Sequence, residues 1–220
     1  MDGIHDMGGM HGFGPVPVAE ETVFVHAWQR RSFALAEVLA WSVPYAADTH
    51  RHAIERLAPV DYLGRDYFEK WAMASQTLVA EAGMADAQEL ASGQKSFDIK
   101  RADHPAVNAD TLLAATRAGA EMLYDPGEIT PRFVVGQMVR VIPHGHSGHT
   151  RAPQYLRGRL GRIIENTGYF HFADTIASGQ GACPEFCYTV AFEASELWGV
   201  EAEGADLMHA DLWEPYLDAV

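Results

Sequence analysis

The stretch from Gly148 to Gly161 contains the residues of this chain best suited to binding an anion. It reads GHTRAPQYLRGRLG and places three arginines, Arg151, Arg157 and Arg159, within nine residues. Glycine and proline punctuate the stretch, which predicts a loop that runs into a strand. An arginine on such a loop can direct its planar guanidinium at an anion and bind it through two hydrogen bonds. The alternative interpretation is a solvated basic turn.

The overall charge excludes several classes of partner. The chain has 220 residues, with 30 acidic against 16 basic side chains and a formal net charge of -14. Binding to nucleic acid requires a basic face that neutralises phosphates, and anionic membranes make a similar demand. Neither is therefore expected as a partner. The length suffices for one large domain or two small ones, each with a buried core.

The compartment can also be predicted from the sequence. No apolar run reaches the roughly 20 residues of a membrane-spanning helix. The opening residues 1–6 are acidic and lack the basic and apolar regions of a secretory signal, so a cytoplasmic location is expected. Cys183 and Cys187 have the wrong spacing for a redox motif, and no second cysteine pair completes a zinc site. Both are interpreted as ordinary thiols.

A self-contained catalytic site is not recognisable. The sequence has no P-loop, no dinucleotide fingerprint, no GxSxG elbow and no HExxH motif, and no serine, histidine and acid stand in a catalytic arrangement. The densest histidine cluster, His144, His146 and His149, lies in a glycine-rich loop and is predicted to be exposed. The chain is therefore either a binding module or one half of an active site whose chemistry lies on another chain. The arginine loop suits the second, because guanidinium groups can stabilise anions held by a partner.

The N-terminal half should position its functional groups on helices. Residues 1–20 are glycine-rich and aperiodic, which predicts an extended arm that is either disordered or packed on another surface. Apolar residues at helical spacing follow, with capping and stop signals around them. Asp48 is predicted to cap a short helix on which Arg51 and Glu55 pair, and Asp66 with Glu69 forms a capping box. The expected helices cover residues 22–41, 49–57, 67–82 and 110–123.

The C-terminal half should be built from strands. After the break at residues 125–127, short apolar runs separated by turn signals predict five strands. Five short strands in about 90 residues suggest a small antiparallel β-barrel, here taken as SH3-like. The predicted fold class is α+β, with an arm and helical domain over residues 1–125 and the barrel over residues 126–220. The expected strands cover residues 137–142, 158–164, 169–172, 188–192 and 207–213.

Taken together, these motifs resemble the β subunit of nitrile hydratase, and the resemblance runs nearly from end to end. One four-residue match would be weak, whereas five blocks in the same order are specific. The blocks are the opening MDGIHDMGG with GFGP, then RHAIER followed by Pro59 and Tyr62-Leu63, then GHTR with Tyr155, Arg157 and Gly158, then Asp174-Thr175, YTV and ELWG, and finally DLWEPYL at residues 211–217.

The resemblance implies a composite active site. In this family the α subunit holds a low-spin Co(III) or a non-haem Fe(III) in a claw of cysteines, two of which are oxidised to sulfinic and sulfenic forms. No metal or other cofactor would then be bound by this chain, and cobalt is favoured over iron by the barrel and tail blocks. The β subunit supplies two arginines that donate to the oxidised cysteine oxygens, and by motif position these are Arg51 and Arg151. The complex is expected to be an αβ heterodimer that pairs again as α2β2.

The resemblance also implies the reaction, which is the hydration of a small nitrile to its amide. The metal acts as a Lewis acid, and the nucleophile is either water or the sulfenate oxygen. Tyr67, Phe68 and Trp71 are candidates to line the substrate pocket with their aromatic faces. Ala47 and His50 stand where the family would be expected to have bulkier apolar groups.

Three other functions stay open at this point. The chain could be a subunit of a thiocyanate hydrolase, in which the equivalent of this chain is split into two polypeptides. It could be an activator or metallochaperone, although such helpers resemble only part of a β subunit. It could also be a stand-alone SH3-like adaptor, which would purify as a monomer without a second chain.

Overall fold

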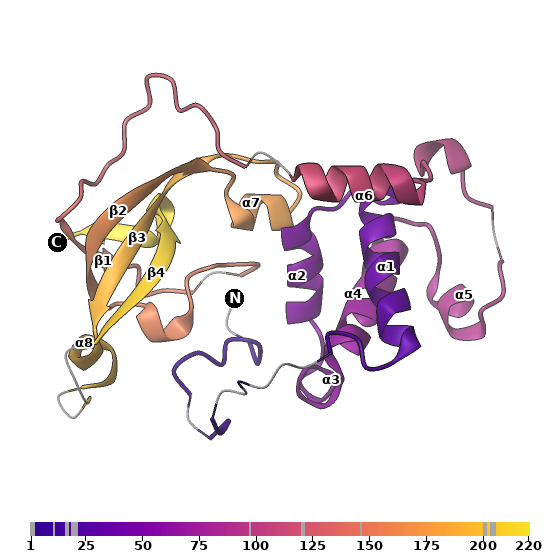
Figure 1. Ribbon diagram of the computed structural model, residues 1–220, viewed down its shortest axis with the longest axis horizontal. Helices are drawn as coiled ribbons and strands as arrows, with labels where there is room; N and C mark the ends of the chain where they lie inside the picture. Colours follow the sequence, from indigo (N-terminus) through magenta and orange to yellow (C-terminus); the bar gives the residue numbers. More distant parts are fainter. Residues whose placement is uncertain are drawn as a thin grey trace. The chain divides into compact units, whose positions relative to one another are not determined.

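The computed structural model describes residues 3–10, 12–15, 18, 22–96, 98–119, 122–145, 147–199, 202 and 206–220. They form two compact units (Figure 1). The helical unit contains residues 3–5 and the described residues of 12–119. The sheet unit contains residues 6–10 and the described residues of 122–220, so the N-terminal arm contributes to both units.

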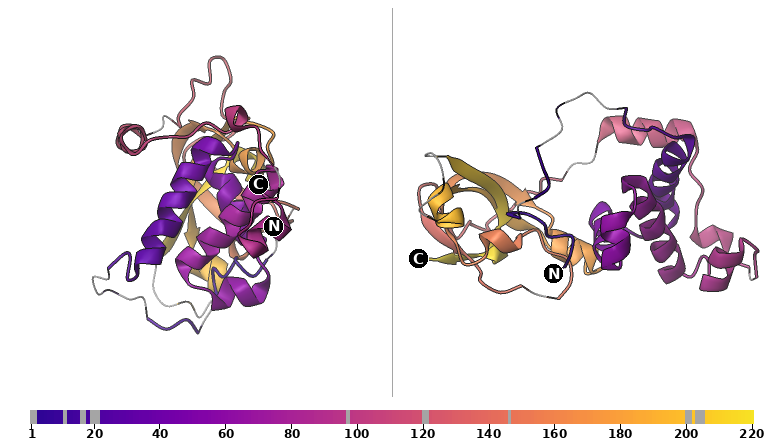
Figure 2. Two further views of the ribbon diagram at one scale, coloured as in Figure 1. Left: turned by 90° about the vertical axis from the view of Figure 1, so that its right-hand side faces the viewer. Right: turned by 90° about the horizontal axis from the view of Figure 1, so that it is seen from below.

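The helical unit is organised around one central helix, α4. Helices α1 and α2 both pack against α4 (Figures 1 and 2). Small residues form part of the core between them, since Ala53 and Ala74 are almost completely buried beside Leu78. The elements are α1 (Ala27–Ser42), α2 (Ala47–Glu55), α3 (Pro59–Gly64), α4 (Tyr67–Glu81), α5 (Ala87–Ser92), η1 (Arg101–Asp103) and α6 (Ala109–Ala118).

The capping signals were partly successful in locating these helices. The box at the start of α4 is confirmed, since Asp66 accepts a hydrogen bond from the Phe68 amide at 2.9 Å and the Asp66 amide donates to Glu69 Oε2 at 2.8 Å. The predicted start at residue 22 is wrong. Helix α1 begins five residues later, where the His26 amide donates to Gln29 Oε1 at 2.8 Å. That local bond satisfies an N-terminal amide of the helix.

The C-terminal unit is a twisted five-stranded antiparallel sheet (Figure 1). The strand order is β4-β3-β2-β1-β5, so the last strand lies beside the first. The strands are β1 (Met138–Val141), β2 (Leu160–Phe170), β3 (Glu185–Glu193), β4 (Leu207–Trp213) and β5 (Leu217–Ala219), and the short helices between them are η2 (Gln154–Leu156), α7 (Ala173–Ala177), α8 (Ala194–Trp198) and η3 (Glu214–Tyr216).

Two strand predictions were wrong for a common reason. The runs at 158–164 and 169–172 were read as separate strands, but β2 is continuous through them. Register shifts between Ile163 and Glu165 and between Asn166 and Gly168 interrupt the alternation without ending the strand, as β-bulges do. The short β5 was read as a tail, yet Leu217 pairs with Val141 of β1.

The predicted closed barrel is not what the structure contains. Strands β4 and β5 are the two edges of the sheet, and no ladder joins them among the described residues. The chain leaves β4 at Trp213 and turns through η3, where Pro215 has no amide hydrogen to donate to a ladder. Three residues then follow in β5, and among the described residues they pair with β1 alone. The sheet is therefore open, and the SH3-like closure is not confirmed.

The largest core lies within the sheet unit. Leu156 of η2 is fully buried in it together with residues of all five strands, including Val139, Ile163 and Leu212. Because Leu156 belongs to the stretch that carries the arginines, this core holds the arginine loop against the sheet. In the described parts of the chain, no helix is long and apolar enough to cross a bilayer.

Candidate functional site

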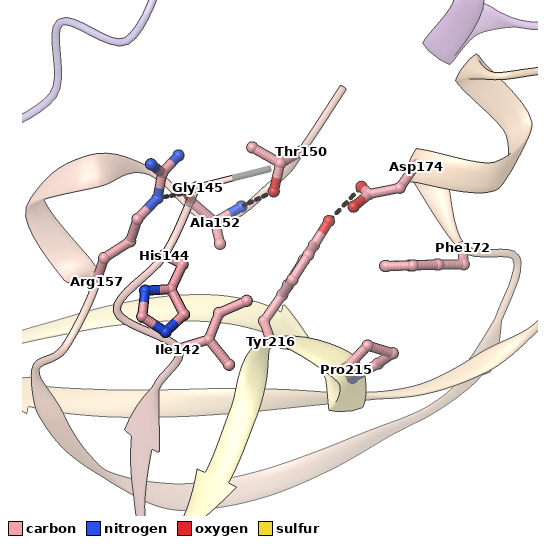
Figure 3. A pocket seen from close by; sticks show the side chains of 10 residues that line it. All are labelled: Ile142, His144, Gly145, Thr150, Ala152, Arg157, Phe172, Asp174, Pro215 and Tyr216. Carbon is pink, nitrogen blue, oxygen red and sulfur yellow. Dashed lines mark hydrogen bonds between the residues drawn. The ribbon is translucent and has the colours of Figure 1, made fainter. Parts of the chain in front are cut away.

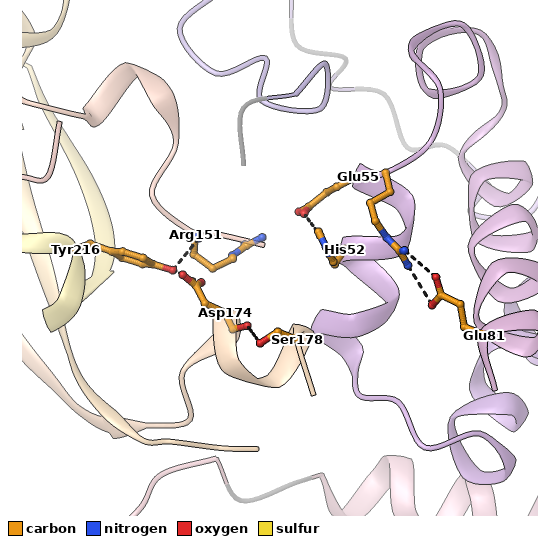
Figure 4. Close-up of polar contacts among 8 residues, drawn as sticks. His52, Glu55, Glu81, Arg151, Asp174, Ser178 and Tyr216 are labelled. Atoms are coloured by element: carbon orange, nitrogen blue, oxygen red, sulfur yellow. Dashed lines mark hydrogen bonds and ion pairs between the residues drawn. The ribbon is translucent and has the colours of Figure 1, made fainter. Parts of the chain in front are cut away.

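The stretch around Arg151 is an anchored loop and not a solvated turn. Ala152 and Leu156 are buried against the sheet. The Arg151 amide donates a hydrogen bond of 3.0 Å to the hydroxyl of Tyr216. That hydroxyl donates in turn to the carboxylate of Asp174 on α7 (Figures 3 and 4). Burial and the Asp174 carboxylate raise the pKa of Tyr216, so its hydroxyl stays protonated and can donate.

The three arginines of the stretch differ in what they can do. The Arg157 side chain is only 7% exposed, and its Nε donates to the carbonyl of Ala152 at 3.1 Å. Arg151 and Arg159 are exposed. In the described part of the chain neither has an ion-pair partner, and the Arg151 guanidinium points away from the Tyr216 ring (Figure 4). Arg151 thus combines a fixed backbone with a guanidinium that is available to an external anion.

The histidine prediction is only partly supported. His144 is exposed, whereas His149 is buried, and His146 lies outside the described residues. The error at His149 has a physical reason. Glycine spacing suggested a projecting turn, but the loop packs against the core through Ala152 and Leu156 and does not extend into solvent.

Arg51 lies on the exposed side of α2 in the helical unit. Its Nη1 donates to Asp48 Oδ1 at 2.7 Å, and the Arg51 side chain is 55% exposed. The predicted pair with Glu55 is not formed, because α2 begins at Ala47 and places Asp48 inside its first turn. Asp48 therefore forms an ion pair with Arg51, three residues later in the helix, and does not cap the helix. The remaining guanidinium donors of Arg51 are available to a second acceptor.

Four of the five predicted pocket residues, all except Ala47, gather in one aromatic cluster of the helical unit. His50 and Trp71 meet edge to face with ring centroids 5.0 Å apart, and Trp71 lies 5.8 Å from Tyr67. Phe68 is buried within the cluster, 6.0 Å from Trp71, whereas Tyr67 is 60% exposed. The aromatic faces offered to solvent are thus those of Tyr67 and the half-buried Trp71. The buried Phe68 ring packs against both of them.

Some residues of these assemblies carried no usable sequence signal. Phe24, Phe33 and Tyr45 also contact the aromatic cluster. Asp174 and Tyr216 are 42 residues apart, so no local period relates them. Both stand in the sequence blocks at 174–175 and 211–217, but only the fold places them next to Arg151. The predicted Ala47 is exposed at the first turn of α2.

His50 should make the stability of the helical unit sensitive to pH. Burial lowers the pKa of His50 below 6.5. A hydrogen bond with the Trp71 backbone opposes this shift, and the positive charge of Arg51 lowers the pKa further. The unfolded chain then binds more protons between the two pKa values, so stability is expected to fall as the pH drops below about 6.5. His50→Gln should flatten this decline in urea titrations followed by circular dichroism. His209→Gln, at an exposed histidine, should leave it unchanged, and equal slopes in all three proteins would contradict the prediction.

A small pocket opens beside the arginine loop in the sheet unit. Its volume is about 130 Å³ and its walls are mostly apolar (Figure 3). The Tyr216–Asp174 pair forms one side and the Arg157 stem another. The lining residues are Ile142, His144, Gly145, Thr150, Ala152, Arg157, Phe172, Asp174, Pro215 and Tyr216.

Comparison with known proteins covers both units. A family model described as nitrile hydratase beta subunit, N-terminal, matches residues 1–117, and its C-terminal counterpart matches residues 124–219. A nitrile hydratase subunit beta of Pseudomonas putida is 36% identical over 220 residues, which cover 99% of each chain. A low-molecular weight cobalt-containing nitrile hydratase subunit beta of Rhodococcus rhodochrous is 36% identical over 224 residues, again 99% of each chain.

A third relative extends the same relationship. The cobalt-containing nitrile hydratase subunit beta of Pseudonocardia thermophila is 30% identical over 234 residues, covering 100% of this chain and 97% of its own length. Both the helical half and the sheet half are therefore shared with these relatives over nearly their full lengths. The chain belongs to the nitrile hydratase β-subunit family.

Proposed function

We propose that this chain is the non-metal-binding half of a nitrile hydratase, which hydrates small nitriles to amides together with an α subunit. The observation that carries the proposal is the end-to-end relationship to β subunits, combined with an arginine that is anchored at its backbone and open at its guanidinium. Activators and metallochaperones, which resemble only part of a β subunit, are disfavoured by the same coverage.

The arginines fit the group that the family implies. Sulfinate and sulfenate oxygens beside a metal are oxyanions, and Arg151 and Arg51 both offer guanidinium donors at exposed positions. A hydrogen bond to a charged group contributes about 1.5–3 kcal/mol, against about 1 for a neutral pair. Arginine also keeps its charge when a partner covers it, whereas a lysine can lose its proton there. The two arginines would hold the oxidised cysteines of the partner in one orientation.

Each part of the chain then has a defined task. The partner's metal would supply Lewis acidity to the nitrile. Co(III) is favoured because two relatives are named as cobalt-containing, and Fe(III) is the alternative. Arg51 and Arg151 stabilise the oxyanions. Tyr67 and Trp71 offer aromatic faces that would orient the substrate and exclude water from its apolar end.

The helical unit also offers a surface on which the α subunit could pack. An apolar hollow of about 150 Å³ lies between α1 and α4, with Leu35, Leu39 and Val79 in its walls. Trp28 and Trp41 of α1 are large and substantially exposed. Aromatic groups of this kind are enriched at protein interfaces. We propose that the αβ pair doubles to α2β2.

Purification with the natural partner tests the whole proposal. The tagged chain should be isolated from its source cells, its companions identified, and the complex assayed for metal and for amide formation from acrylonitrile or benzonitrile. The expected result is a second chain in equal amount, with one cobalt per αβ pair and an α2β2 mass in solution. A metal-free monomer without hydration activity would overturn the proposal.

A further inference from the structure

The N-terminal arm touches the sheet unit at the arginine loop. Residues 6–10 belong to this unit although they lie more than a hundred residues before it in the chain. The Gln154 amide, in the first turn of η2, donates to Asp6 Oδ2 at 2.8 Å. Arg157 Nη2 lies 4.0 Å from the same Asp6 oxygen, and both side chains are more than nine-tenths buried. The arm is therefore attached to the loop by a buried carboxylate.

A second contact explains why the arm contains paired glycines. The backbone of Gly8 and Gly9 lies directly against the ring of Tyr155, which is also part of η2. A Cβ added at Gly8 would stand 2.5 Å from Cε1 of that ring, and one at Gly9 would stand 3.0 Å from Tyr155 Cβ. Contacts shorter than 3.0 Å force a rearrangement, so only glycine lets the arm lie flat here.

The Tyr155 ring has little freedom to move aside. It stacks on Trp198 at 6.4 Å with an interplanar angle of 16°, and its hydroxyl lies 3.9 Å from Met208 Sδ. Burial, with a contribution from Asp6, raises the pKa of Tyr155, in keeping with a covered ring. A side chain at Gly8 must therefore lift the arm or displace η2.

The contacts of Arg157 carry this attachment toward Arg151. The Nη2 atom of its guanidinium faces Asp6. The Nε atom donates to the carbonyl oxygen of Ala152 (Figure 3). Ala152 follows Arg151 directly, and its own amide donates to Thr150 Oγ1 at 3.2 Å. Tyr216 thus holds the peptide group before Arg151, and Thr150 holds the one after it. Arg157, and through it the arm, holds the next peptide group along the chain, between Ala152 and Pro153.

We propose that residues 6–10 act as a clamp that positions Arg151, with Asp6 and Arg157 as positioning residues and Gly8 as the contact that seats the clamp. The inference rests on the proposed role of Arg151 and adds to it. Arg157 was one of three equivalent arginines in the sequence, and here it serves the loop internally. The clamp would restrict the guanidinium to the orientation that an oxyanion of the partner requires.

Gly8→Ala tests the clamp, because Gly8 has no left-handed φ and the substitution adds only the clashing methyl group. In the purified complex, hydrogen exchange of the amides of residues 151–157 should become faster by on the order of tenfold. Gly64→Ala is the matched control, since its added Cβ meets nothing within 4 Å and its φ is also ordinary. It should leave that exchange unchanged, and unchanged exchange in Gly8→Ala would overturn the proposal.

Kinetics separate positioning from general stability. Gly8→Ala should lower kcat for nitrile hydration about 3- to 30-fold with KM within about twofold, as expected when a catalytic group is misplaced but substrate binding is intact. Asp6→Asn, which keeps an acceptor for the Gln154 amide but loses the charge facing Arg157, should show a smaller loss than Asp6→Ala. Equal kcat in Gly8→Ala and wild type, despite faster exchange, would overturn the proposal.

The Arg151→Lys background distinguishes failure of the clamp from failure of the proposed function. If the clamp acts through Arg151, adding Gly8→Ala to Arg151→Lys should cost no further activity while the loop still exchanges faster. A full additional loss would overturn the clamp and leave the function intact. Wild-type turnover in Arg151→Lys alone would instead remove the role of Arg151 in the proposed function.

Discussion

Arg151→Lys is expected to lower kcat for nitrile hydration by about a hundredfold or more, while the complex with the α subunit still assembles. Removal of one donor to a catalytic oxyanion typically costs 10²–10³ in kcat, which sets the scale. Lysine keeps the charge but replaces a planar fork by a point charge on a flexible stem, so two parallel hydrogen bonds cannot form. The Arg151 amide would still be held by Tyr216.

The same stretch provides the control. Arg159→Lys makes an identical chemical change at an exposed arginine that has no anchoring bond to Tyr216, and it should keep turnover near that of wild type. Arg51→Lys should also reduce kcat, although part of the Arg51 guanidinium is already engaged by Asp48. Steady-state kinetics and the mass of the complex are measured for all three variants. Wild-type kcat in both Arg51→Lys and Arg151→Lys would exclude the proposed donors.

Glu214→Ala is expected to be the most destabilising substitution of a polar side chain in the sheet unit. Glu214 is buried and accepts hydrogen bonds from the Tyr188 hydroxyl at 2.5 Å and from the Arg132 amide at 2.9 Å. Burial and this bond raise the pKa of Tyr188, so the hydroxyl stays a donor. The Tyr188 hydroxyl is a buried donor, and leaving it without a partner costs about 1–3 kcal/mol; with the part-buried Arg132 amide added, the expected loss is about 3 kcal/mol.

Asp211→Ala is the matched comparison on the same sheet. Asp211 accepts a hydrogen bond of 2.6 Å from Thr189 Oγ1, but this pair is exposed and water can replace the lost partner. Its loss should change the free energy of unfolding by no more than about 0.5 kcal/mol. Urea unfolding followed by tryptophan fluorescence measures both variants. Similar midpoints for Glu214→Ala and Asp211→Ala would show that the buried carboxylate is not the basis of the stability.

The boundaries of several elements needed information that lies outside each segment. The capping box at Asp66 and Glu69 predicted the start of α4 because both partners are three residues apart and bond locally. The start of α2 was misplaced, since Asp48 can serve either as a cap or, as found, as a partner of Arg51 within the first turn. Local propensity does not decide between two short-range bonds of similar strength.

The sequence by itself determined the class of each half, the family and the identity of the arginine loop. Those features depend on residue type and short spacing, which are properties of a linear chain. Only the tertiary structure decided that the sheet is open, that Asp174 and Tyr216 anchor Arg151, and that Arg157 faces inward to Asp6. These contacts join residues that are 42 or more positions apart. Such pairs form only when the burial of a common core repays the entropy of closing the long loops between them, and no local pattern encodes that balance.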